Sequence, residues 1–249
     1  MVLGDRQIYD VCKEYQFPEN LRQKVHFCGY VSRQLPNRSR SEIRKELSVA
    51  DDESLVLVTA GGGQDGYDLL STSVAATGSL AKRLRVRTML VTGPELGKEQ
   101  IKAIHKAARS HAGLQVIEFT DDLMSYMNAA DTVISMAGYN TVCELLTLGK
   151  RSILVPRVKP VEEQKIRAER MANFGVFRTI LPDVLTPDVL ENAIAKQLQA
   201  ARNSAPLSTY IDLGALPYIT TILKAGAPSS AGRFVASATP LVQMQMRSE

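Results

Sequence analysis

The sequence of residues 134–145 is ISMAGYNTVCEL, and this stretch decides the fold of the chain. The pattern predicts the end of a buried strand, a turn at Gly138, and a helix that begins directly after the turn. Such an arrangement aims backbone N–H groups and the positive end of a helix dipole at one point, which suits an anion such as phosphate. Thr141 can add a hydroxyl donor, and Glu144 can accept hydrogen bonds from a sugar diol. We interpret the stretch as part of a nucleotide site, the alternative being an ordinary turn and helix start.

Around this stretch, short apolar runs alternate with helical segments. Strands are expected at residues 54–59, 87–92, 115–118, 132–135, 152–155 and 176–180. Helices are expected near residues 41–47, 66–82, 98–111, 122–129, 139–148, 162–174, 187–202 and 213–224. Such alternation across short loops indicates an α/β fold, a doubly wound parallel sheet with helices on both faces. Ligands bind such sheets beyond the carboxyl ends of the strands.

The two ends of the chain are predicted to be less regular. Residues 1–24 are interpreted as an irregular connector from a missing N-terminal domain. A further buried strand is expected at Val25–Val31, within a domain that covers residues 25–225. Residues 226–249 are rich in Ala, Ser and Pro without periodicity, so a flexible tail is expected there.

Composition excludes several classes of protein. The chain of 249 residues is 45% hydrophobic and 22% charged, as ordinary globular proteins are. Its net charge of +4 is mild and its bases are scattered, so no nucleic-acid partner is expected. Cys12, Cys28 and Cys143 form no metal or disulfide pattern, which favours the reducing cytoplasm. No apolar run approaches the roughly 18–20 residues of a membrane span, although a peripheral membrane contact stays open.

Two more loops follow expected strands. The loop Gly61–Gly66 is neither a Walker sequence nor a dinucleotide fingerprint, but its glycine amides can approach a ligand closely. The alternative is a tight strand–helix turn. Residues 155–160 lead into Glu163 and Gln164, a carboxylate–amide pair that can bind hydroxyl groups. The alternative is that the acids at this helix start, Glu162 and Glu163, complement the helix dipole. No catalytic base and no metal-ligand spacing are apparent, and the three histidines lie outside these loops.

The order of these motifs resembles the C-terminal, donor-binding half of GT-B glycosyltransferases. The nearest likeness is to the family-28 type, typified by the peptidoglycan-precursor N-acetylglucosaminyltransferase, and it covers roughly residues 25–200. The motifs that carry it are, in order, Gly61–Gly66, Glu118–Met124, Ala130-Asp131, the Gly-x-x-Thr-x-x-Glu of residues 138–144, Val155-Pro156, and Glu163-Gln164 with Ala168. The fold implied is the Rossmann-like C-terminal domain of a GT-B protein.

The resemblance also implies roles for individual residues. Glu144 would bind the ribose, Gly138–Thr141 the diphosphate at the helix start, and Arg33 would approach the phosphates. Phe119–Thr120 would border the base, and Glu163–Gln164 would bind the donor sugar. The full set of nucleotide-sugar-binding residues is Arg33, Gly62, Gly63, Gln64, Phe119, Thr120, Gly138, Tyr139, Asn140, Thr141, Glu144, Glu163 and Gln164. No cofactor and no metal are expected, because the nucleotide sugar is itself the substrate.

The implied activity is that of an inverting glycosyltransferase. It would transfer a hexose or N-acetylhexosamine from a nucleoside diphosphate sugar, expected to be UDP-linked, to an acceptor that the sequence does not indicate. In such enzymes the general base and the acceptor site lie chiefly in the N-terminal domain, so this chain alone is expected to bind donor with little transferase activity. Met136-Ala137 and Arg167 replace Arg-Ser and Asn of the peptidoglycan enzyme, and Gly63 replaces Ser, which leaves the sugar and the base open.

Two alternatives stay open. The first is a partner-dependent or non-catalytic nucleotide-sugar-binding subunit. The second is an isomerase like the UDP-sugar 2-epimerases, which share the GT-B architecture but place acids and histidines around the sugar.

Overall fold

Six parallel strands form one sheet in the order β3-β2-β1-β4-β5-β6. The computed structural model describes residues 1–203 and 211–225. The strands are β1 (Ser54–Thr59), β2 (Val86–Val91), β3 (Leu114–Ile117), β4 (Thr132–Ser135), β5 (Ser152–Leu154) and β6 (Arg178–Thr179). The chain runs outward from β1 to β3 on one side of the sheet and from β4 to β6 on the other. The order therefore reverses between β1 and β4, which is the switch point of a doubly wound sheet.

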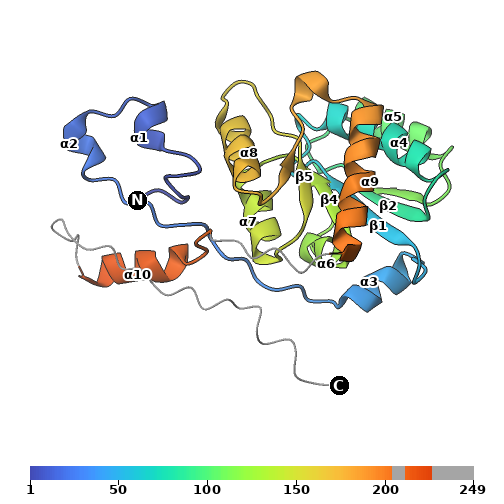
Figure 1. Ribbon diagram of the computed structural model, residues 1–249, viewed down its shortest axis with the longest axis horizontal. Coiled ribbons are helices and arrows are strands. Elements are labelled where there is room, and N and C mark those ends of the chain that lie inside the picture. Colours follow the sequence, from blue (N-terminus) through green and yellow to red (C-terminus); the bar gives the residue numbers. More distant parts are fainter. Residues whose placement is uncertain (204–210, 226–249) are drawn as a thin grey trace.

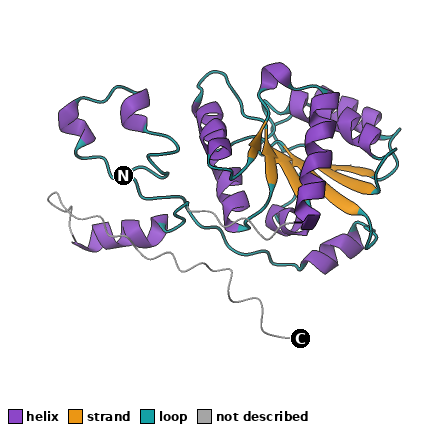
Figure 2. Cartoon of the chain, viewed as in Figure 1, coloured by secondary structure: helices purple, strands orange, loops and turns teal. Residues whose placement is uncertain are grey.

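Helices cover both faces of the sheet, as Figure 2 shows. The helical segments are α1 (Val11–Glu14), α2 (Glu19–Arg22), α3 (Arg40–Glu46), α4 (Tyr67–Leu80), α5 (Lys98–Ala108), α6 (Leu123–Ala129), α7 (Tyr139–Thr147), α8 (Glu163–Asn173), the 3₁₀ turn η1 (Pro182–Val184), α9 (Pro187–Asn203) and α10 (Ala215–Ala225). Their positions and those of the strands confirm the predicted α/β fold; only α1, α2 and the short η1 were not expected. Helices α1, α2 and α10 lie to one side of the sheet and its covering helices (Figure 1).

Successive residues of the central strand pack alternately into two separate hydrophobic cores. All six residues of β1 are buried, as in a strand covered on both faces. Leu55 and Leu57 pack in one core with residues of α3, α6, α7 and α8. Val56 and Val58 pack in the other core with residues of α4, α5 and α9. The strand period of two thus accounts for the two-sided burial.

The predicted strand at Val25–Val31 is wrong. Only isolated bridges occur there: Phe27 pairs with Val2, Gly29 with Gly4, and Val31 with Gly214. These short pairings go to different segments, so no continuous ladder forms. Gly29 has a φ of +81°, which also departs from extended backbone. The apolar run reflects burial between the N-terminal segment and residues 212–214, and the predicted tail at 226–249 lies outside the described residues.

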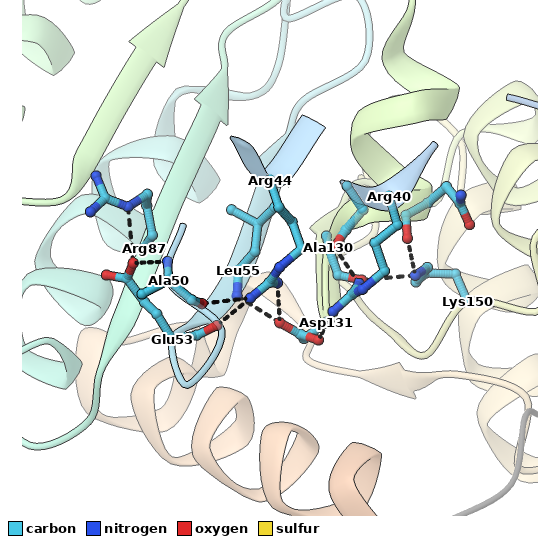
Figure 3. Close-up of polar contacts among 11 residues, drawn as sticks. Arg40, Arg44, Ala50, Glu53, Leu55, Arg87, Ala130, Asp131 and Lys150 are labelled. Carbon is cyan, nitrogen blue, oxygen red and sulfur yellow. Dashed lines mark hydrogen bonds and ion pairs between the residues drawn. The ribbon is translucent and has the colours of Figure 1, made fainter. Parts of the chain in front are cut away.

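At the amino ends of the strands, Asp131 ties the start of β1 to the start of β4 (Figure 3). One carboxylate oxygen accepts hydrogen bonds from the backbone N–H of Leu55 at 2.7 Å and from Arg44 at 3.2 Å. The other oxygen accepts from Arg40 at 2.6 Å. The ammonium of Lys150 donates to the carbonyls of Asn128 and Ala130, just before Asp131. This network fixes the edge of the sheet opposite to the edge where a ligand would bind.

We predict that Asp131→Ala destabilises the fold by about 3 kcal/mol. The variant leaves the Leu55 N–H unbonded and removes the carboxylate from the Arg44 side chain, which is only 13% exposed. Urea unfolding measures the loss of free energy. The matched control is Asp52→Ala, whose partner Arg85 is exposed, and it should cost at most about 1 kcal/mol. Equal losses in the two variants would contradict a structural role for the Asp131 network.

Candidate functional site

A cavity of about 460 Å³ lies beyond the carboxyl ends of β1 to β5. Its walls come from the loops that follow these strands and from the start of α7. The cavity therefore sits over the switch point between β1 and β4, where doubly wound sheets bind ligands. All the predicted site residues line it except Arg33 and Glu163.

The start of α7 is open toward this cavity. Gly138 is the N-cap residue, and no side chain of residues 1–203 or 211–225 caps the first turn with a hydrogen bond. The first amides of any helix lack an intrahelical acceptor, so these N–H groups are available to a ligand. A Cβ placed on Gly138 would meet no atom within 4 Å. The buried Thr141 also lines the cavity. This arrangement can hold an anion.

The glycine loop after β1 serves packing as well as access. Gly63 has a φ of +103°, and a Cβ there would lie 2.6 Å from the Thr92 carbonyl oxygen. Gly93, in the loop after β2, has a φ of +87°, and its Cβ would lie 2.4 Å from the Gly61 carbonyl oxygen. The two loops therefore meet backbone to backbone. The sequence interpretation explained the glycines of this loop by the approach of a ligand. At least Gly63 is required instead by the contact between the two loops.

The ring of Tyr139 anchors the start of α7 to the N-terminal segment. It stacks on the buried Tyr30, with ring centroids 5.5 Å apart and an interplanar angle of 15°. Its hydroxyl oxygen accepts a hydrogen bond from the Val31 N–H at 3.3 Å. Burial raises the pKa of the Tyr139 hydroxyl above its usual value. The residue thus fixes where the open helix end points.

Arg33 lies beside the cavity rather than in its wall. Its guanidinium donates to the Asn140 side-chain oxygen at 2.5 Å, and its backbone N–H donates to Thr147. The arginine therefore brings a positive charge to the first turn of α7. Its Nε is buried and has no hydrogen-bond partner among the described residues.

Glu144 lines the cavity one turn into α7 and is half-buried. Its carboxylate forms no hydrogen bond or ion pair within the part of the chain that the structure describes. Burial raises the pKa of its carboxyl, and the charge of Arg33 opposes that rise. A carboxylate that is partly desolvated and unpaired can accept hydrogen bonds from ligand hydroxyls.

Glu163 and Gln164 point to different places. Gln164 lines the main cavity, and its side-chain oxygen accepts a hydrogen bond from the Arg157 backbone at 3.2 Å. Glu163 is ion-paired with the buried Arg167 one turn along α8. Both residues of that pair line a separate cavity of about 230 Å³, next to Tyr9 and Tyr30. The structure therefore does not bring Glu163 to the other predicted residues.

The sequence interpretation missed several residues of the cavity wall. Asp65 and Arg157 form an ion pair, with 3.0 Å between Nη1 and Oδ2, and both line the cavity. The sequence could have indicated these two residues, because they are oppositely charged and lie in two loops already chosen as candidates. Glu95 lies in the loop after β2, which no motif had marked. Its backbone N–H donates to the Gly62 carbonyl at 2.8 Å.

The model of the glycosyltransferase family 28 C-terminal domain matches residues 55–210. The chain belongs to glycosyltransferase family 28. The match includes the loops that form the cavity, and it confirms the resemblance deduced from the order of the motifs.

Two curated relatives are enzymes named UDP-N-acetylglucosamine--N-acetylmuramyl-(pentapeptide) pyrophosphoryl-undecaprenol N-acetylglucosamine transferase. The one from Alkaliphilus oremlandii is 28% identical over 155 residues, which cover 62% of this chain and 42% of that protein. The one from Porphyromonas gingivalis (strain ATCC 33277) is 27% identical over 254 residues, which cover 98% of this chain and 62% of that protein. The chain thus spans about half the length of the relatives it matches.

Solved structures share the fold. MurG from Acinetobacter baumannii superposes with a TM-score of 0.55 at 21% identity, over 75% of this chain and 53% of that one. WaaG, a glycosyltransferase involved in lipopolysaccharide biosynthesis, gives a TM-score of 0.60 at 20% identity, over 91% of this chain and 62% of that one. These likenesses confirm the predicted GT-B type of fold.

We predict different outcomes for alanine at two glycines of the site. Gly63→Ala should cost about 2 kcal/mol or more, because the methyl group would meet the Thr92 carbonyl from a backbone with positive φ. Gly138→Ala should cost less, about 1 kcal/mol at most, because alanine is only a poorer N-cap residue than glycine, the φ is −61° and the methyl group faces open space. Urea unfolding of both variants tests this contrast. A large loss for Gly138→Ala would show that the start of α7 is not open as described.

Proposed function

We propose that this chain is the donor-binding half of an inverting glycosyltransferase. It would bind a UDP-linked hexose or N-acetylhexosamine and present it for transfer to an acceptor. The observation that carries the proposal is the convergence, on one cavity, of an uncapped helix start with Thr141, the guanidinium of Arg33 nearby, and the unpaired carboxylate of Glu144. These groups suit a diphosphate next to a ribose. The names of the relatives, which specify UDP-N-acetylglucosamine, support UDP as the nucleotide.

The cavity offers each part of a nucleotide sugar a different environment. The diphosphate would lie at the start of α7, and Glu144 would accept hydrogen bonds from the ribose hydroxyls. The base would lie between the backbone of Thr120 and the ring of Phe119, which is 65% exposed. The sugar would then extend toward Gln164 at the opposite end of the cavity.

The same groups would assist departure of the nucleotide. In a single displacement, an acceptor hydroxyl oxygen attacks the anomeric carbon from the face opposite the diphosphate. The bond from this carbon to the phosphate oxygen breaks, its electron pair stays on the diphosphate, and the hydroxyl proton passes to a base. The α7 amides and Arg33 would stabilise the negative charge that develops on the leaving diphosphate.

We infer that the base and the acceptor site belong to a protein half outside this chain, either a further domain or a partner subunit. The support is that the chain spans about half the length of its relatives, and that no histidine lines the cavity. Any membrane contact would be peripheral and made through that half. The three cysteines are unpaired, which favours the cytoplasm as the location. In the described residues, no helix is long and apolar enough to span a membrane.

A 2-epimerase-like isomerase is the weaker candidate. His26, His105 and His111 all lie outside the cavity wall, so the histidines expected around the sugar of such an enzyme are not there. A non-catalytic nucleotide-sugar sensor would use the same cavity, and it differs from a transferase only in what the other half contributes.

A thermal-shift panel tests the proposed ligand class. UDP-, GDP- and dTDP-sugars at millimolar concentration should raise the melting temperature through mass action, and a UDP-sugar should raise it most. No shift with any of the three would contradict the proposed function. Gly138→Ala, which is expected to fold normally, should lose most of the shift because its methyl group occupies the approach to the helix start.

Glu144→Ala should abolish the shift given by the best UDP-sugar and leave the unliganded protein folded. The reason is that the Glu144 carboxylate has no hydrogen bond or ion pair in the described protein, so its removal breaks neither. The control is Glu99→Ala, which removes an exposed carboxylate that does not line the cavity and should keep the shift. Retention of the shift in Glu144→Ala would show that the ribose assignment is wrong.

The affinity for a UDP-sugar should also fall in acid. Only the ionised Glu144 carboxylate accepts two hydroxyl hydrogens, and burial raises its pKa. Affinity should therefore be full above this raised pKa and decline as the pH falls through it, at a higher pH than for an ordinary carboxyl. Calorimetric titrations across this range measure the decline, and Glu144→Gln should bind weakly with no such pH dependence.

A further inference from the structure

The two ends of the main cavity differ in chemistry. The end beyond β2 and β3 carries the exposed ring of Phe119, a surface on which a flat base can stack. The end beyond β5 carries the polar side chains of Asp65, Arg157 and Gln164. The start of α7 lies between them, after β4. If the diphosphate occupies this middle position and the base packs on Phe119, the sugar must face the polar end.

Asp65 and Arg157 meet across the end of β4. Asp65 belongs to the loop after β1 and Arg157 to the loop after β5, and β4 lies between these two strands in the sheet. Their side chains are 45% and 33% exposed. An ion pair with this exposure adds little to stability, so ligand groups can replace it at little cost. In the described part of the chain, the Nε of Arg157 has no hydrogen-bond partner.

The pair is complementary to sugar hydroxyls. Each hydroxyl is both a donor and an acceptor, a carboxylate only accepts, and a guanidinium only donates. Two neighbouring hydroxyls can therefore donate one hydrogen bond to Asp65 and accept another from Arg157. Because the two charges cancel, the pair favours a neutral sugar over one that carries a carboxylate or a phosphate.

We propose that Asp65 and Arg157 together form the sugar subsite, where they bind two adjacent hydroxyls of a neutral donor sugar. Gln164 supports this subsite, since its side-chain oxygen accepts a hydrogen bond from the Arg157 backbone N–H. Its amide N–H groups have no acceptor among the described residues, so they can donate to the sugar. This inference rests on the proposed function, because it takes the ligand to be a nucleotide sugar. It adds two residues that were not among the predicted site residues.

Calorimetry of two ligands separates this claim from the proposed function. We would measure the Kd of UDP and of the UDP-sugar that gives the largest thermal shift, for the wild type and for Asp65→Ala, Arg157→Ala and the double variant. Each single variant should raise the Kd of the UDP-sugar roughly tenfold or more, as expected for the loss of hydrogen bonds to charged groups. The Kd of UDP should change less than about twofold, because UDP lacks the sugar. The Kd of the UDP-sugar for Arg157→Lys should lie between the values for the wild type and for Arg157→Ala, because lysine keeps the positive charge but lacks the planar guanidinium.

The matched control is Asp52→Ala with Arg85→Ala, an exposed ion pair of the same chemistry outside the cavity wall, and it should change neither Kd. If the Asp65 and Arg157 variants lost affinity equally for UDP and for the UDP-sugar, the proposed sugar subsite would be wrong. It would also be wrong if they lost no affinity for either ligand. In both cases UDP binding by the wild type would leave the proposed function standing. A wild type that binds neither ligand would overturn the proposed function itself.

Discussion

The site depends on one constraint, the uncapped start of α7. A capping side chain at this position would stabilise the helix by roughly a few tenths of a kcal/mol over glycine, but the chain has Gly138 there, and no side chain of the described residues caps the first amides. Two contacts fix the position of the helix start instead. Tyr139 stacks on Tyr30, and the buried Arg167 donates to the Ala137 carbonyl at 3.0 Å, one residue before the N-cap. The protein thus fixes the position of the amides and leaves their hydrogen-bonding capacity to a ligand.

The sheet topology explains why the other polar groups gather at the same place. β1 and β4 are neighbours with their onward connections on opposite sides, so the loops after them diverge and leave a hollow. Gly63 and Gly93 allow the loops after β1 and β2 to pack against each other on one side of this hollow. Asp131 fixes the amino ends of β1 and β4 at the opposite edge. A rigid sheet therefore positions loops that are themselves held by backbone contacts.

The sequence predicted those features that depend on local patterns. Each strand of the sheet is a short apolar run between turn residues, and the alternation of strands with helices predicts that the sheet is parallel. Prediction from the sequence failed for features that depend on contacts between distant segments. The run Val25–Val31 is apolar, but it forms single bridges to two separate segments, residues 2–4 and Gly214, and forms no strand. Asp65 pairs with Arg157 across 92 positions of sequence, and only the fold brings these two residues together. The pairing of Glu163 with Arg167, by contrast, is a local i,i+4 pattern of a helix that the sequence interpretation did not use.

The most direct measurement of the central claim is a crystal structure of this chain with a UDP-sugar bound. The account predicts the diphosphate at the amides of Tyr139–Thr141, the ribose hydroxyls on Glu144, and the uracil beside Phe119. The sugar should lie at the end of the cavity that Asp65 and Arg157 form. A nucleotide bound elsewhere, such as in the smaller cavity beside Arg167, with the start of α7 left empty, would contradict the account.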